Sequence, residues 1–377
     1  MKEIFMIIVK EVKTKREQKD FLNFPLNMYK TNPYFVPPLY MDEKKIFNKD
    51  YVYHDQCDAV FFNAYDGNKI VGRISGILQK VSNEKNNERR VRFTRFDTID
   101  NQEVANKLFE AVENWAKTLG MDTICGPLGY SDLEREGLLI EGFDQLSTFE
   151  EQYNHQYYQK LIENCGYVKE VDWVEYKLKN KVERDDRLKR LSDIMLKRYK
   201  LHYGEAKNTK DFIKKYGEKL FELLDETYVN LYGTVPFTKA MKDMMISNFK
   251  LIINLKFVAV ILDENDNVVC FGLCLPSIGK ALQKSKGHLT IPALIRVLKS
   301  IKKPEIIDLA LIGVSKEYQM RGVSSSLIYR IQEMLDDKNI QFAETNLNLE
   351  NNVSIQNQWK NFDAKQHKRR RSFVKKI

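Results

Sequence analysis

The 377-residue sequence has few cysteines, and no short spacing pairs them. The odd number argues against a disulfide framework, and the absence of a CxxC pair argues against a zinc site. Cysteines inside apolar runs, such as Cys270 and Cys274, usually behave as small buried hydrophobic residues. We therefore expect no metal site, and a reducing compartment. The five cysteines are Cys57, Cys125, Cys165, Cys270 and Cys274.

The sequence also lacks a long hydrophobic run. The first apolar stretch, Ile4 to Val9, is followed at once by Lys10 and Glu11, so it is too short for the core of a secretory signal. It predicts a first strand over Ile4–Val12. No stretch approaches the roughly 18 apolar residues of a membrane span. These absences predict a soluble, cytoplasmic protein with no membrane partner.

Acidic residues are fewer than basic ones, and the net charge is +9. We interpret most of this excess as spread along the chain, with a local exception at the C-terminus, KQHKRRRSFVKKI (365–377). The favoured interpretation of that stretch is a solvated edge strand whose charges deter pairing with another chain. Binding of nucleic acid phosphates is an alternative that we do not favour. A third possibility is contact with an acidic substrate or with a cofactor phosphate.

Two similar orders of strands and helices follow one another along the chain. Each is a hairpin, then a strand, a helix and a strand. This order of elements predicts an α/β (α+β) protein. A charge-rich stretch, Asn180–Arg190, separates the two orders and predicts domains 1–180 and 181–377. The predicted elements of the first half are 59–65, 69–78, 91–96, 102–119 and 123–125. Those of the second half are 257–262, 268–275, 306–314, 323–337 and 342–347.

The connection after the strand at 306–314 has the composition of an anion-binding turn. It reads Gln319-Met320-Arg321-Gly322-Val323-Ser324, and apolar spacing places the start of the next helix near Gly322. The first amides of a helix have no internal partner, and the helix dipole adds about half a positive charge there. Gly322 lets the backbone approach a ligand closely, and Arg321 adds charge. A single glycine is weak evidence, because any strand-to-helix connection can contain one.

The same segment resembles motif A of the GNAT acetyltransferase superfamily, in which a strand, the pattern Q/R-x-x-G-x-G/A and a helix follow each other. Ser324 stands where glycine or alanine is usual, and serine is small enough for the turn to form. The resemblance implies two GNAT-like domains, each with a mixed, mostly antiparallel sheet, and acetyl-CoA as cofactor. It implies that the amides of this loop bind the pyrophosphate. The implied cofactor-binding residues are Ile312, Gly313, Val314, Gln319, Met320, Arg321, Gly322, Val323, Ser324, Ser325 and Asn352.

The whole chain also resembles a group of large bacterial GNAT-like proteins that carry an NPxWVPPL-like segment. That segment is Asn32–Leu39 here, with Phe35 in place of tryptophan. In the first half, the turn that corresponds to the motif, Asp97–Glu103, has no glycine and carries three carboxylates. Because carboxylates repel a pyrophosphate, we expect the coenzyme site in the second half only.

Acetyl transfer to an amine requires a base, because a protonated amine cannot attack a thioester. Asp308 lies within the strand at 306–314, eleven residues before Gln319, where the histone acetyltransferase branch of the family places its glutamate base. Glu344 lies on the next strand, whose alternation puts Glu344, Asn346 and Asn348 on one face. The alternative for either carboxylate is a polar residue that meets solvent.

The sequence thus predicts an acyl-CoA-dependent N-acyltransferase that moves an acetyl group to the amine of a small molecule or a protein. Trp359 stands where the family often has a tyrosine as general acid, and an indole cannot protonate a thiolate. This substitution favours one alternative, a GNAT-fold binding protein without turnover. The net charge of +9 permits another, a nucleic-acid-associated protein.

Overall fold

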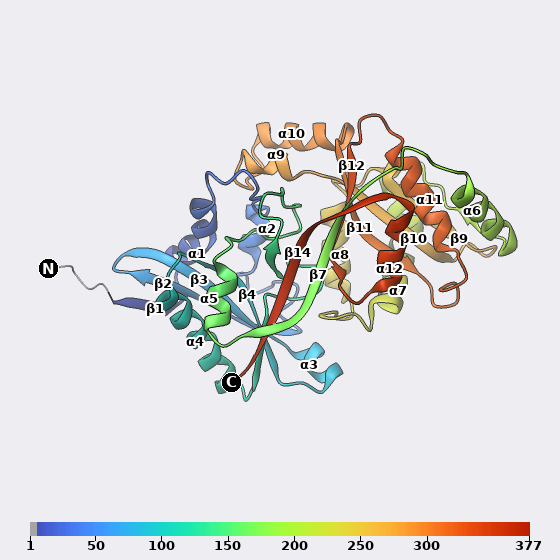
Figure 1. Cartoon of the computed structure of the whole chain (residues 1–377). Coiled ribbons are helices and arrows are strands. Elements are labelled where there is room, and N and C mark those ends of the chain that lie inside the picture. The colour runs from blue at the N-terminus through green and yellow to red at the C-terminus, as the bar shows by residue number, and fades with distance from the viewer. Residues whose placement is uncertain (1–5) are drawn as a thin grey trace. The chain divides into compact units, whose positions relative to one another are not determined.

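The same order of strands and helix is present in both halves of the chain in the computed structural model, which describes residues 6–377 (Figure 1). The first half contains β1 (Ile7–Glu11), β2 (Cys57–Asp66), β3 (Lys69–Gln79), β4 (Arg90–Thr98), α4 (Gln102–Thr118) and β5 (Thr123–Gly126). The second half contains β8 (His202–Tyr203), β9 (Val258–Leu262), β10 (Val268–Pro276), β11 (Ile306–Val314), α11 (Ser324–Leu335) and β12 (Phe342–Thr345). The predicted first strand is present from Ile7, and its first residues lie outside the described range.

Further elements connect and extend these repeats. The helices are α1 (Lys15–Met28), α2 (Tyr40–Lys45), α3 (Lys80–Asn86), α5 (Tyr158–Asn164), α6 (Arg187–Arg198), α7 (Thr209–Tyr228), α8 (Lys239–Phe249), α9 (Gly279–Gln283), α10 (Ile291–Lys302) and α12 (Val353–Gln358). The short 3₁₀ helices are η1 (Leu255–Phe257) and η2 (Trp359–Asn361). The remaining strands are β6 (Leu138–Glu141), β7 (Val168–Lys179), β13 (Asn348–Leu349) and β14 (Asp363–Lys376).

The chain forms two units, and their boundaries differ from a single division near residue 180. Unit 1 contains the chain up to Trp173 together with Gly279–Ala293 and Lys368–Ile377. Unit 2 contains Val174–Ile278 and Leu294–His367. The strands β7 and β14 therefore each contribute residues to both units.

Each unit has a mixed, mostly antiparallel sheet, as predicted. In unit 1 the strand order is β1-β2-β3-β4-β5-β14, with β4 and β5 parallel and the end of β14 antiparallel to β5. In unit 2 the order is β8-β9-β10-β11-β12-β7, with β11 and β12 parallel and β7 antiparallel to β12. The sixth strand of each sheet thus comes from the other half of the sequence, an arrangement that we call strand exchange.

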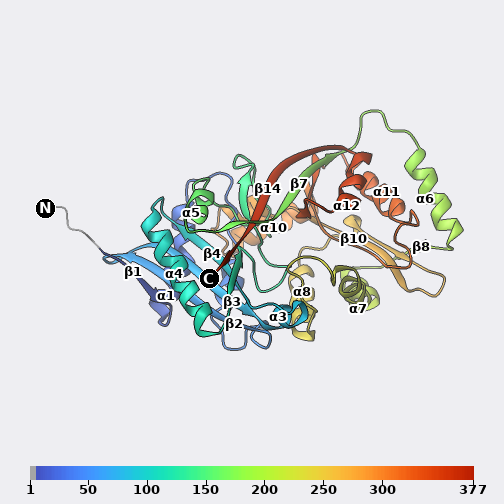
Figure 2. The same ribbon diagram turned by 60° about the horizontal axis from the view of Figure 1, so that its bottom comes forward.

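Glycines allow one helix to approach each sheet closely. A Cβ atom on Gly72 of β3 would lie 2.8 Å from Leu108 of α4, and one on Gly272 of β10 would lie 2.5 Å from Leu327 of α11. Figure 2 shows α4 against β1–β3. The opposite faces are covered by α1 in unit 1 and by α7 in unit 2. The two units therefore share the same layers, in which α4 and α11 cover equivalent faces.

The equivalent strands of the two units, β4 and β11, each contain a β-bulge. In β11, Ala310 is the extra residue, because Leu273 pairs with Leu311 and Cys274 pairs with Leu309. In β4 the register shifts in the same way near Arg95, which has a positive φ of 51°. Beyond its bulge β11 no longer pairs with β12, since their ladder ends at Leu309↔Thr345. Bulges bend the strand that carries them, so β11 and β12 diverge at this point.

Candidate active site

Four buried ionisable side chains lie on four strands of unit 2. Asp308 of β11 is 4% exposed, Glu344 of β12 is 5% exposed and Glu175 of β7 is fully buried. Nε2 of His367, on β14, lies 3.4 Å from Oε1 of Glu344, and the His367 side chain is 4% exposed. Charged groups are rarely buried without partners, so such a cluster marks a candidate site.

Strand register explains why the carboxylates share one face. Asp308 is the parallel partner of Glu344, and Glu344 is the antiparallel partner of Lys177. Because side chains alternate along a strand, Glu175 lies on the same face as Lys177. The intervening residues, Ile307, Ala343 and Leu178, belong to the hydrophobic core that contains the side chains of α11. The carboxylates of Asp308, Glu344 and Glu175, which we call the acidic row, therefore lie on the face of the sheet that α11 does not cover.

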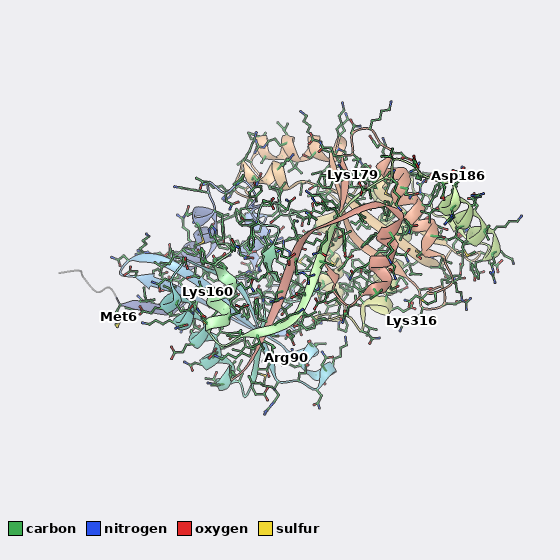
Figure 3. The ribbon with its side chains drawn as sticks, viewed as in Figure 1. Met6, Arg90, Lys160, Lys179, Asp186 and Lys316 are labelled. Carbon is green, nitrogen blue, oxygen red and sulfur yellow. The ribbon has the colours of Figure 1, made fainter. Side chains whose placement is uncertain are left out.

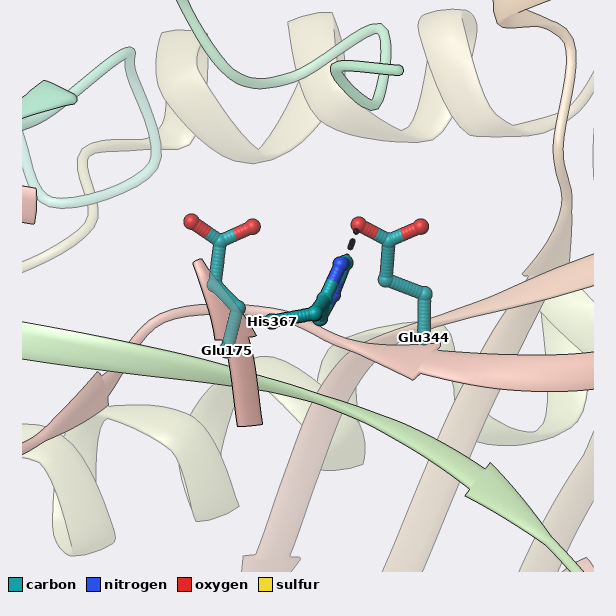
Figure 4. A group of neighbouring side chains, drawn as sticks. All are labelled: Glu175, Glu344 and His367. Atoms are coloured by element: carbon teal, nitrogen blue, oxygen red, sulfur yellow. Dashed lines mark ion pairs between the residues drawn. The ribbon is translucent and has the colours of Figure 1, made fainter. Parts of the chain in front are cut away.

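The side chains of Glu175, Glu344 and His367 converge. One ligand atom from each lies within 4.8 Å of the other two, and Figure 4 shows the His367 ring between the two carboxylates, with its ion pair to Glu344 dashed. An imidazole and two carboxylates are ligand types that a divalent cation accepts, and the sequence did not predict this group. A carboxylate whose orientation is held by a neighbouring imidazole can also act as a general base.

The structure contradicts a solvent-facing role for the two predicted catalytic carboxylates, because Asp308 and Glu344 are both buried. The predicted polar face of the next strand is only partly correct. The strand β12 ends at Thr345, and Asn346 then donates through its side chain to the Ala310 carbonyl at 3.4 Å. Asn348 has a structural role instead, described next.

Trp359 is a core residue of unit 2. It is 3% exposed, it packs in the same cluster as Phe362, and its Nε1 donates to Oδ1 of Asn348 at 2.7 Å. A buried indole needs a partner for its N–H, and Asn348 provides the acceptor. Asn352, which the family resemblance implied as a cofactor residue, caps α12 by accepting from the Ile355 amide at 3.3 Å.

The predicted anion-binding turn joins β11 to α11. Met320 and Gly322 both have left-handed backbone conformations, with φ of 61° and 79°, and the Met320 side chain is 99% exposed. A Cβ at position 322 would meet only the Met195 side chain, at 3.4 Å, so glycine is required by the positive φ. No side chain caps the start of α11, which begins at Ser324. These features fit a phosphate group at the helix N-terminus.

Two residues that the resemblance implies as cofactor-binding, Ser325 and Gln319, form hydrogen bonds within the protein. The Ser325 amide and hydroxyl both donate to the Gly322 carbonyl, at 3.0 and 2.6 Å. The side chain of Gln319 donates to the Val314 carbonyl at 3.0 Å. Arg321 lies 4.0 Å from Glu317, and its side chain is about half exposed. Arg321 is therefore positioned to add positive charge near the turn, whereas Ser325 and Gln319 stabilise its shape.

The backbone of β11 between the bulge and the turn contacts α7. Tyr228 donates its hydroxyl to the Ile312 carbonyl at 3.0 Å and accepts from the Ile312 amide at 3.4 Å. The amide of Lys316, which is labelled in Figure 3, donates to Oε1 of Glu226 at 2.8 Å. Ile312 is opposite Gly272 of β10, but its amide and carbonyl are bound to Tyr228. In an antiparallel pair such groups point away from the partner strand, so Tyr228 lies at the edge of β11 that faces away from β10.

We expect Tyr228→Phe to raise the affinity for coenzyme A by about three- to tenfold. The substitution removes a hydroxyl that a pantetheine amide would have to displace from Ile312, and one hydrogen bond contributes about 1 kcal/mol. Isothermal titration of coenzyme A into both proteins measures the change. Tyr216→Phe is the matched control, since that hydroxyl donates to the Glu205 carbonyl elsewhere in unit 2. A weaker affinity in Tyr228→Phe would show that the hydroxyl contacts the ligand.

The helix start in unit 1 differs from that of α11. The side chain of Asn101 caps α4 by accepting from the amides of Glu103 and Val104, at 2.8 and 3.3 Å. Asp97 forms an ion pair with Arg73 at 2.8 Å, and the Thr98 amide donates to the Tyr158 hydroxyl. The amides of Glu103, Val104 and Thr98 thus already have acceptors within the protein.

The cysteines are buried or partly buried and form no disulfide. Burial and the nearby Asp308 raise the pKa of the Cys274 thiol to about 12, and burial raises the pKa of the Cys270 thiol to the same value. Only a thiolate is a good nucleophile, so Cys274 is not set up to carry an acyl group. Among the helices of residues 6–377, none combines the length and apolar character needed to cross a membrane.

The C-terminal basic stretch is not a solvated edge strand, and that interpretation is wrong. Residues Phe373–Lys376 of β14 pair with β5, so this part of β14 is not at an edge of the unit 1 sheet. Arg370 is fully buried, and Arg371 forms an ion pair with Asp172 at 2.7 Å. Lys375 pairs with Glu113 at 2.7 Å. Most of these charges therefore stabilise unit 1 internally and are not displayed for a nucleic acid.

Solved structures share this architecture. A tandem GNAT protein from the clavulanic acid biosynthesis pathway matches with a TM-score of 0.53 at 9% identity, over 98% of both chains. A GCN5-related N-acetyltransferase from Sphaerobacter thermophilus matches with a TM-score of 0.50 at 10% identity, over 98% of this chain and 95% of the other. The chain has a tandem GNAT fold. The two repeats described above are its two GNAT-like domains.

The sequence relatives of this chain are distant. Protein YghO of Escherichia coli is 26% identical over 98% of this chain and 95% of its own length. A bacterial ceramide synthase of Caulobacter vibrioides is 27% identical over 82% of this chain and 80% of its own length. No family model matches the sequence.

The sequence predicted Asp308 and Glu344 but did not predict Glu175 or His367. Glu175 lies near the end of the first half and His367 lies in the basic C-terminal stretch, and no motif connects either residue with Glu344. The one available signal was Glu175 itself, an acidic residue within the stretch that forms β7. Its relation to Glu344 depends on the strand exchange of the tandem GNAT fold, which local periodicity does not reveal.

Proposed function

We propose that this protein is an acyl-CoA-dependent N-acyltransferase, with its reaction centre at the acidic row of unit 2. The observation that carries the proposal is the placement of Asp308 and Glu344 immediately before β11 and β12 diverge, while the uncapped start of α11 follows the other end of β11. From Asp308 to Val314 the strand extends about 20 Å, at about 3.3 Å per residue. An extended pantetheine arm held by its phosphates at the turn can reach the acidic row.

The residues present suit the deprotonation of an amine. The thioester supplies the activated acyl group, and the amine must lose a proton for the amide to form. Glu344 is the base that we favour, because His367 contacts it directly and holds its orientation. Asp308, its neighbour in register, is positioned to bind the ammonium form of the acceptor before the proton is lost. Trp359 takes no part, because its N–H is bound to Asn348.

The acceptor class that we propose is an amine that carries a long hydrocarbon chain. The support is the ceramide synthase relative, whose name denotes formation of an N-acylated long-chain amino alcohol. Acetyl-CoA is the simplest donor that the turn can accept, and a longer acyl-CoA presents the same pyrophosphate. The turn therefore does not distinguish between them.

The proposal is tested by turnover with a panel of donors and acceptors. Acetyl-CoA and palmitoyl-CoA are each combined with sphinganine, spermidine and lysine, and release of the coenzyme A thiol is followed while mass spectrometry detects the amide. We expect an amide product with sphinganine. Binding of coenzyme A without turnover on any amine would instead support a GNAT-fold binding protein, and absence of binding would remove both interpretations.

A further inference from the structure

The segment 267–304 contains basic residues but no acidic ones. Residues 267–304 contain seven Lys and Arg residues and no Asp or Glu, so this window has a charge of +7 (7 − 0), compared with +9 for the whole chain. The basic residues are Lys280, Lys284, Lys286, Arg296, Lys299, Lys302 and Lys303. All but Arg296 are exposed.

The helix α10 within this segment exposes a continuous apolar stripe. Ile291, Leu294, Ile295 and Leu298 are 78%, 45%, 62% and 53% exposed. Their spacing of three, one and three residues places all four within an arc of about 100° on a helix. Ala293 and Val297 on the opposite side are buried, so the helix is packed on that side. Scattered exposed apolar residues are ordinary, but four on one face of one helix indicate an interaction surface.

Basic side chains border this stripe. Lys299 follows Ile295 by four residues and Lys302 follows Leu298 by four, so each lysine lies one helical turn beyond an exposed apolar residue. Their long aliphatic stems can lie along the apolar surface while the ammonium groups reach anionic groups beside it. A helix with an apolar face flanked by lysines is the pattern of a segment that lies in a membrane interface.

We propose that α10, with Lys299, Lys302 and Lys303 at its C-terminal end, docks on the surface of an anionic lipid bilayer. A surface of uniform negative charge complements a window of +7 that contains no acidic residue, and its acyl-chain boundary accepts the stripe. The alternatives account for only one of the two features. A nucleic acid would bind the lysines but leave Ile291, Leu294 and Ile295 in water. A second copy of this chain would cover the stripe but place two windows of like charge together.

The experiment measures flotation of the full chain with lipid vesicles and requires no turnover, so its outcome is independent of the proposed reaction. We expect binding to vesicles of phosphatidylglycerol and phosphatidylcholine at low salt, weaker binding at high salt, and little binding to phosphatidylcholine alone. The stripe variant should lose binding although its fold is retained, because the replaced side chains are exposed. It combines Ile291→Ser, Leu294→Ser, Ile295→Ser and Leu298→Ser.

The lysine variant tests the electrostatic part. Each basic residue near an anionic surface contributes roughly a factor of five, so replacing three should lower the partition coefficient on the order of 100-fold. This variant combines Lys299→Gln, Lys302→Gln and Lys303→Gln. Matched controls remove exposed residues of the same kinds elsewhere and should bind as the wild type does. They are Val182→Ser with Leu251→Ser, and Lys30→Gln with Lys207→Gln and Lys214→Gln.

Circular dichroism and thermal melting confirm that each variant folds. The proposal is wrong if the wild type does not float with anionic vesicles, or if the stripe variant floats equally well. It is also wrong if sedimentation shows a dimer that the stripe variant abolishes, since a second copy would then occupy the surface. Binding to duplex DNA that exceeds binding to vesicles and resists the stripe substitutions would assign the lysines to nucleic acid.

Discussion

Glu344→Gln is expected to lower kcat by about 10²–10⁴-fold, the usual contribution of a general base, while the affinity for coenzyme A is retained. The amide is nearly isosteric with the carboxylate and keeps a polar partner for His367, but it cannot accept the proton of the amine. The measurement is steady-state turnover with the acceptor identified by the panel, together with calorimetry for the coenzyme. The deficit should shrink as pH rises, because a larger fraction of the amine is then already neutral.

Two further variants make this result specific. Asp308→Asn should raise KM for the amine more than it lowers kcat, since we assign Asp308 to binding the ammonium form. Asp363→Asn removes an exposed carboxylate from the start of β14 and should change neither parameter. If Glu344→Gln turns over at the wild-type rate between pH 6 and 9, the base lies elsewhere; if Asp308→Asn alone abolishes kcat, the two roles are exchanged.

Ser324→Asp is expected to weaken coenzyme A binding on the order of 100-fold without destabilising the protein. The substitution places a negative charge at the first residue of α11, where a pyrophosphate would lie, and loss of one or two charge-assisted hydrogen bonds accounts for this magnitude. The same charge interacts favourably with the helix dipole and should raise stability by about 0.3–1 kcal/mol. A variant that binds coenzyme A more weakly but is more stable than the wild type indicates a ligand site, because a purely structural turn gives no such loss of affinity.

Ser324→Asn is the matched control, because it has a similar shape and no charge, and it should bind coenzyme A within a few-fold of the wild type. Calorimetry measures the affinity, and the melting temperature reports stability. Gly322→Asp is less informative, since its positive φ of 79° makes any side chain costly for folding. Unchanged affinity in Ser324→Asp would mean that the turn is only a connection between β11 and α11.

The elements around the turn could be predicted because their signals are local. The strand over 306–314 has the predicted bounds, and the helix predicted at 323–337 is present as Ser324–Leu335. An apolar run, a glycine and a helical periodicity fall within about thirty residues there, and none of them depends on distant partners. The same applies to the two hairpins, whose turn residues lie next to the strands that they join.

The contacts of β14 could not be predicted, because they depend on partners far away in the sequence. A strand rich in arginine and lysine is typical of an exposed edge, but Phe373–Lys376 pair with Thr123–Gly126 of β5. Arg371 and Lys375 are then partly buried, and Asp172 and Glu113 provide their acidic partners. The place of His367 beside Glu344 has the same origin, since it follows from the position of β14 and not from any local pattern.

Strand exchange also determines when each sheet can be completed during synthesis. β5 ends at Gly126, but the strand that covers its free edge is formed by residues near the C-terminus. At about 5–20 residues per second, a ribosome needs roughly 10–50 s to make the intervening 250 or so residues. Throughout that interval the nascent first half presents the unpaired N–H and C=O groups of β5, a template on which another nascent chain can add a strand. The earliest-made sheet of this protein is thus completed only after the residues of β14 have been synthesised.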